Sequence, residues 1–182
     1  MSDPFEAGAV LIEVEATEFR QLFDPLDPAP YPERDLDPKA VDFIVDWSKE
    51  APRDAPFALL VHLDGPPSPP DSEAMLSHAV HEFFSQRSQA YRRKLDALFR
   101  RGRISLAIGL SFLALTVAIS DLLALKLRGS QLGDILRQGI AIVGWVAMWR
   151  PLEVFLYDWW PIKAEIKLSD RLARMPVRVK QG

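Results

Sequence analysis

The stretch ISLAIGLSFLALTVAIS, from Ile104 to Ser120, decides the fold because its seventeen consecutive residues carry no charge. Asp121 and four more apolar residues follow before Lys126. As a helix, 104–125 would be about 33 Å long, enough to cross a hydrocarbon core of about 30 Å. We therefore predict a transmembrane helix over 104–125. The alternative is a core helix of a soluble protein, but roughly 100 other residues would have to surround it.

A second apolar segment predicts a second helix, over 135–160. Its cleanest part, Gly139 to Trp149, is eleven residues, and Arg150, Pro151 and Glu153 follow. Crossing the bilayer then requires Arg150 to reach an interface or a partner. We expect a transmembrane hairpin with an outer loop over 126–134 and a kink at Pro151. The competing interpretation is a short half-buried helix that ends at Pro151 and continues along the interface.

Positive charge flanking the two helices predicts their orientation. Six cations precede the first helix and six follow the second, whereas the loop offers only Lys126, Arg128 and Arg137. The excess of Lys and Arg on cytoplasmic flanks places both ends in the cytoplasm, and the acidic start shows no targeting signal. We expect inner headgroups, rather than nucleic acid, to contact the first set: Arg92, Arg93, Lys94, Arg100, Arg101 and Arg103. Tyr157, Trp159 and Trp160 are expected as anchors at the membrane interface.

The chain before these helices reads as a small cytosolic α/β domain over 1–71. Residues 1–70 hold fifteen acidic and five basic side chains. Strands are predicted over 8–16 and 57–63, with a helix between them opened by Asp37 and Pro38. A long basic amphipathic helix follows over 72–103, and 161–182 is predicted as a basic cytosolic tail. The fold class is thus mixed, α+β. Because two strands make a poor sheet, we expect another copy or a partner subunit to extend it.

A proline- and aspartate-rich loop over 24–38 contains the densest cluster of carboxylates. Asp24, Asp27, Glu33, Asp35 and Asp37 could hold a hard cation, as in a cation-dependent enzyme, yet their spacing matches no EF-hand. Asx turns and helix capping are the simpler interpretation. Docking of a partner on the stiff extended backbone is a third possibility.

Other polar residues point to no reaction. His78, His81 and Glu82 share a helix face but lack a further metal ligand, and His62 stands in a strand without a nucleophile beside it. The chain has no cysteine. We therefore predict no catalytic residues, no metal and no cofactor. In the second helix Arg150 and Glu153, three residues apart, are expected to pair or to snorkel, and Asp121 is expected at the outer interface.

Small residues four apart, Ala107 with Ser111 and Ala114 with Ala118, could allow helices to pack closely in the bilayer. Three longer stretches carry a resemblance: LFDPLDPAPYPERDLDPKAVDFIVDW (22–47), GWVAMWRPLEVFLYDWWPI (144–162) and RLARMPVRV (171–179). Over most of its length the chain resembles a group of uncharacterised bacterial membrane proteins. The resemblance implies an inner-membrane location and the organisation above, and it assigns no activity and no residue roles.

The sequence favours a non-enzymatic, membrane-anchored interaction or scaffold protein. Its expected partners are the lipid bilayer and either further copies of the chain or another membrane protein. The alternative is a small channel or transporter subunit in which Arg150, Glu153 and Asp121 line a polar interior.

Overall fold

The computed structural model describes residues 8–31, 33–52, 55–66, 68–126 and 131–182. The chain forms two compact units, residues 1–90 with 165–182 and residues 91–164. α2 and α4 each contribute to both. In chain order the elements are β1 (Val10–Ala16), the 3₁₀ turn η1 (Phe19–Leu22), α1 (Pro38–Glu50), β2 (Phe57–Leu63), α2 (Ser72–Lys126), α3 (Gln131–Glu153), the π-helical turn η2 (Val154–Asp158), α4 (Trp159–Leu172) and β3 (Val177–Gln181).

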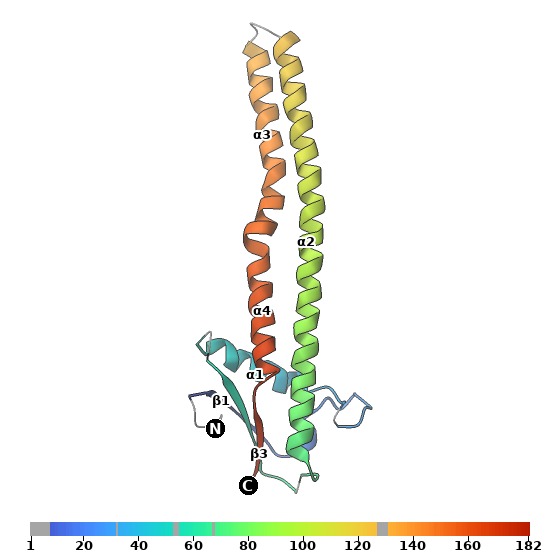
Figure 1. Cartoon of the computed structure of the whole chain (residues 1–182), viewed down its shortest axis with the longest axis vertical. Coiled ribbons are helices and arrows are strands. Elements are labelled where there is room, and N and C mark those ends of the chain that lie inside the picture. The colour runs from blue at the N-terminus through green and yellow to red at the C-terminus, as the bar shows by residue number, and fades with distance from the viewer. Residues whose placement is uncertain (1–7, 32, 53–54, 67, 127–130) are drawn as a thin grey trace. The chain divides into compact units, whose positions relative to one another are not determined.

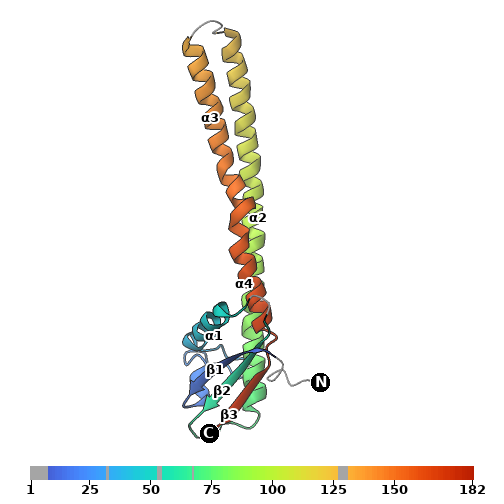
Figure 2. The same cartoon turned by 90° about the vertical axis from the view of Figure 1, so that its left-hand side faces the viewer.

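The first unit is built on a three-stranded parallel sheet in the order β1, β2, β3 (Figure 2). The predicted strand over 57–63 is confirmed, and β1 begins two residues later than predicted. Parallel neighbours require a crossover connection, and α1 supplies the one between β1 and β2. The mixed α and β character of the fold is therefore as predicted.

The start of α1 follows from two adjacent residues. Asp37 is the N-cap, and its carboxylate accepts hydrogen bonds from the backbone N–H groups of Lys39 (2.9 Å) and Ala40 (3.3 Å). Pro38 occupies the first turn, where its missing N–H costs nothing. The buried face of α1 joins one side of the sheet and the first turns of α2 in a single core. Its most deeply buried members include Ile12, Phe23, Leu59, Val61, Leu76, Val80, Phe84 and Leu172.

The C-terminal segment differs from the prediction. Residues 161–182 were expected to form a basic tail, but they contain most of α4 and all of β3. β3 pairs with β2 over Leu59–Leu63, and Val177 is buried in the core. The chain itself thus supplies the third strand that we expected from another copy or a partner subunit.

The second unit contains two helices that lie side by side, α3 and the part of α2 after residue 90 (Figure 1). α2 passes Gly102 without a break, so one helix contains the segments predicted separately over 72–103 and 104–125. The predicted loop over 126–134 is shorter in the structure, since α3 begins at Gln131; residues 127–130 lie outside the described part of the chain. The predicted second helix is divided into α3, η2 and the start of α4.

Two helical stretches are long and apolar enough to cross a membrane, Ser72–Leu122 and Gln138–Leu172. In each, only 17% of the most apolar window is buried within the chain. A core helix of a soluble protein is mostly buried within its own chain, and these two windows are not.

Candidate functional site

Small residues bring α2 and α3 into close contact. Gly102, Gly109 and Thr116 are spaced every seven residues along α2, and all three are buried. A Cβ at position 102 would lie 2.7 Å from Val154 Cγ1, and one at position 109 would lie 3.1 Å from Met148 Sδ. On α3, a Cβ at Gly144 would lie 2.4 Å from Thr116 Oγ1. We call Gly102, Gly109, Thr116 and Gly144 the hairpin seam; only small residues allow helices to approach so closely.

The predicted small-residue pairs do not take part in this contact. Ala107, Ser111, Ala114 and Ala118 are all exposed, and the Ser111 hydroxyl donates to the Ala107 carbonyl of its own helix (2.9 Å). Within the chain, the seam therefore lies on a different face of α2 from the one predicted.

The helix becomes irregular just after Pro151, where a kink was predicted. Pro151 has no N–H to donate to the Ala147 carbonyl one turn earlier. The π-helical turn η2 begins three residues later, at Val154. The indole N–H of Trp159, the first residue of α4, donates to the carbonyl of Phe155 in this turn (3.0 Å). The side chain of Trp159 thus provides a hydrogen bond to a carbonyl in the irregular stretch, and π turns of this kind are often found at functional sites.

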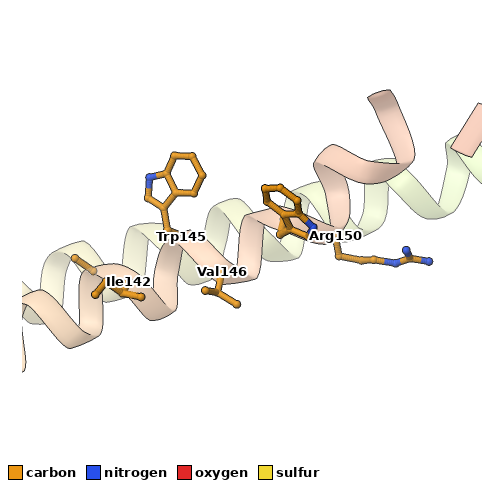
Figure 3. Close-up of a pocket in the computed structure, with 6 residues that line it drawn as sticks. Ile142, Trp145, Val146 and Arg150 are labelled. Carbon is orange, nitrogen blue, oxygen red and sulfur yellow. The ribbon is translucent and has the colours of Figure 1, made fainter. Parts of the chain in front are cut away.

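Arg150 and Glu153 form an ion pair along one helix face, with 2.9 Å between Arg150 Nη1 and Glu153 Oε2. Their side chains are 71% and 38% exposed within the chain. A shallow groove of about 570 Å³ lies beside Arg150 and is otherwise lined by apolar residues, including Trp145 and Trp149. In Figure 3 the Arg150 side chain extends away from Ile142, Trp145 and Val146. The predicted pairing of Arg150 with Glu153 along the helix face is therefore observed.

Asp121 lies far from this pair. Pro151, next to Arg150, packs beside Gly109, with its Cγ 3.5 Å from the position of a Cβ there. Asp121 is twelve residues further along α2, about 18 Å at about 1.5 Å per residue. It is exposed near the end of the helix. The three predicted membrane-embedded polar residues therefore do not form one cluster.

In the second unit, the residues predicted to contact lipid headgroups lie close to those predicted as anchors at the membrane interface. The rings of Phe99 and Phe155 stack with 6.2 Å between their centroids, and Gly102 packs against Val154. The aromatic segment after α3 therefore lies beside the basic segment of α2, although more than fifty residues separate them. All six predicted cations are exposed: Arg92, Arg93, Lys94, Arg100, Arg101 and Arg103. Tyr157 and Trp160 are 66% and 62% exposed, whereas Trp159 is half-buried and carries Lys163 over its ring at 5.2 Å.

In the first unit, the carboxylates of the proline-rich loop bind backbone N–H groups. Asp24 accepts from Leu26 (2.8 Å), and Asp27 accepts from Ala29 (3.0 Å) and Asp35 (2.8 Å). The N–H of Asp35, and next that of Ala29, hold the pKa of Asp27 below its ordinary value, with help from the positive charge of Arg34. Asx turns and capping are thus confirmed. Among the described residues no cluster could hold a metal ion.

The three histidines of the chain lie in different surroundings. His81 donates from Nε2 to the Met175 carbonyl (2.8 Å), which ties α2 to the segment before β3. His78 is exposed, and both line an open polar hollow of about 320 Å³ with Glu82 and Arg174. His62 lies in β2 on the sheet face opposite the core, and sequence reasoning did not foresee the charged residues that flank it there.

Comparisons of the chain with protein-family models, with curated proteins and with solved structures found no match.

Proposed function

We propose that this chain is a membrane-anchored interaction protein without enzymatic activity. The hairpin of α2 and α3 spans a bacterial inner membrane, both ends of the chain lie in the cytoplasm, and the α/β unit binds further copies of the chain or another membrane protein.

One observation carries the proposal: the basic segment of α2 lies beside the aromatic segment that follows α3. Cations that attract anionic headgroups and amphipathic rings that settle at the interface belong at the same depth. From the basic and aromatic segments, both helices of the hairpin continue into apolar stretches that are largely unburied within the chain. Lipid is the partner that fits this combination of surfaces.

The Arg150–Glu153 pair fits an anchor better than a pore. The two charges neutralise each other along one helix, which lowers the cost of placing them near the interface. Asp121 is about 18 Å along the hairpin and does not extend them into a polar path. A channel or transporter subunit remains the competing function. Solute or ion flux through proteoliposomes that is lost in Arg150→Leu or Glu153→Leu would establish that competitor.

Topology is tested by cysteine labelling. The chain has no cysteine of its own, so only the introduced residue reacts. Gln131→Cys and Gly182→Cys are expressed separately in intact bacterial cells and treated with a membrane-impermeant maleimide. We expect labelling at position 131, and at position 182 only after the cells are permeabilised. Labelling of both sites in intact cells would overturn the proposed orientation, and recovery of the chain without detergent would overturn the anchor.

Partners are tested by cross-linking the full chain in membranes, extracting it in mild detergent and identifying the products by mass spectrometry. We expect products that contain two or more copies of the chain or a copy with another membrane protein. A strictly monomeric chain would contradict the interaction function.

A further inference from the structure

The sheet has two unlike faces. Successive side chains of a strand point to opposite sides, and in this sheet Ile12, Leu59 and Val177 belong to the side that joins the core. We call the other side the outer face. It is formed by Leu11, Glu13 and Glu15 of β1, Ala58, Leu60 and His62 of β2, and Arg178 and Lys180 of β3.

The strand register sorts charge across the outer face. Glu13 pairs with Leu60, which pairs with Arg178; Glu15 pairs with His62, which pairs with Lys180. All four charged residues are exposed, His62 is half-buried, and Leu60 is only 6% exposed. Each row therefore runs from a carboxylate on β1, over an uncharged centre or a histidine, to a cation on β3. One edge of the face is acidic and the other is basic.

We propose that the outer face is a docking surface for a second copy of this chain, related to the first by a two-fold axis parallel to the strands. Rotation about that axis lays β1 of one copy over β3 of the other. The rotation leaves the position of each residue along the strand direction unchanged. Glu13 of one copy therefore faces Arg178 of the other, and Glu15 of one copy faces Lys180 of the other. Leu60 and His62 lie near the axis and face their own counterparts.

The charges favour this arrangement over a face-to-face arrangement with the two-fold axis across the strands. A two-fold axis across the strands would lay β1 over β1 and β3 over β3, placing carboxylates against carboxylates and cations against cations. Like-charge contacts of this kind suppress wrong pairings. A second copy fits because the face is self-complementary, which is the requirement for a two-fold interface.

The size of the face predicts a weak contact that depends on the membrane anchor. Three strands about 4.8 Å apart and five residues long cover about 240 Å². Stable complexes bury about 800 Å² on each partner. Confinement of the copies to one membrane raises their effective concentration, which can make such a contact productive. The inference therefore rests on the proposed function, and its test uses the full chain in a membrane.

The test reverses one charged edge at a time. The first variant is Glu13→Lys with Glu15→Lys, which makes both edges basic; the second is Arg178→Glu with Lys180→Glu, which makes both acidic. Each variant alone should give at least about tenfold less cross-linked dimer in proteoliposomes, because its copies repel one another. Mixing the two variants should restore the dimer as a heterodimer. A chain that carries all four substitutions should self-associate again, since its edges are merely exchanged.

Single cysteines locate the axis. His62→Cys should cross-link to itself through a short bis-maleimide, whereas Glu13→Cys should cross-link to Arg178→Cys and much less to itself. The matched control is Lys49→Cys on the exposed face of α1, which should give little cross-linking.

The outcomes separate this surface from the broader function. If the chain self-associates in membranes and both reversal variants associate as strongly as the natural chain, the outer face is not the interface and the interaction function stands. If each variant loses association but neither the mixture nor the fourfold variant recovers it, the acidic and basic edges do not meet across the two-fold axis and the proposed arrangement is overturned. If the natural chain never associates, the proposed function fails as well.

Discussion

Gly144 of α3 lies so close to Thr116 of α2 that a Cβ at position 144 would be 2.4 Å from Thr116 Oγ1. Thr116 cannot easily turn away, because its hydroxyl donates to the Leu113 carbonyl (2.8 Å) and the residue is buried. The contact therefore fixes how closely the two helices of the hairpin approach.

Gly144→Ala should weaken the hairpin. The added methyl must push α3 away or force Thr116 out of its hydrogen bond, and overpacking of this kind typically costs about 1–3 kcal/mol. Gly139→Ala is the matched control, since nothing lies within 4 Å of a Cβ there and alanine favours a helix. Unfolding of both variants in detergent micelles, followed by circular dichroism, measures the difference. Equal midpoints for the two variants would show that the hairpin seam does not set the packing.

The seam shows where sequence reasoning on the hairpin stops. The absence of charge over 104–120 was enough to predict a long apolar helix, because length and composition are local properties. The packing face was not predictable in the same way. Several small residues are available on α2, and which of them meet α3 depends on the rotation of both helices. The seven-residue spacing of Gly102, Gly109 and Thr116 was a usable signal, since it repeats on one face of a helix.

Trp159→Phe should destabilise the irregular turn after α3. Phenylalanine keeps a ring for Lys163 and for the contact with Trp160, but it loses the indole N–H that donates to the Phe155 carbonyl. A lost hydrogen bond typically costs about 1 kcal/mol. Hydrogen exchange of the amides over 154–160 should become faster. Trp160→Phe is the control, because it leaves that bond in place, and an equal effect of the two changes would remove the role assigned to Trp159.

Val177→Ala should loosen the sheet of the first unit. Val177 is 7% exposed and belongs to the core, so truncation removes about two methylene equivalents, roughly 1.6 kcal/mol, and adds the cost of a cavity. Amides of β2 should exchange faster in the full chain, because β3 is their hydrogen-bonded neighbour. Lys167→Ala on the exposed side of α4 should change little. Unchanged exchange in β2 would mean that β3 adds little to the sheet.

The strand that Val177 belongs to was missed for a physical reason. VRVKQ alternates apolar and charged residues over only five positions, and its two cations resemble the basic flank of a membrane helix. β1 and β2 were recognisable because their apolar runs are longer and bounded by turns. β3 becomes a strand only because β2 offers it a buried edge, and that edge is formed by residues more than a hundred positions earlier in the chain. The outer face could not be foreseen either, since its charge rows exist only through the register of all three strands.

The proline-rich loop should lose its shape in acid. The ionised Asp27 carboxylate accepts hydrogen bonds from the N–H groups of Asp35 and Ala29, which lower its pKa in the folded loop. The unfolded state then binds the proton more readily, so the stabilisation is fully present above the ordinary aspartate value of about 3.9. It is lost as the pH falls through the lowered folded value. An NMR titration of the full chain in micelles should show the Asp27 carboxyl and the Asp35 amide changing together below about pH 3.9. In Asp27→Asn, the Asp35 amide should no longer follow that transition. If the amide still follows it, the acid sensitivity of the loop comes from a different carboxylate.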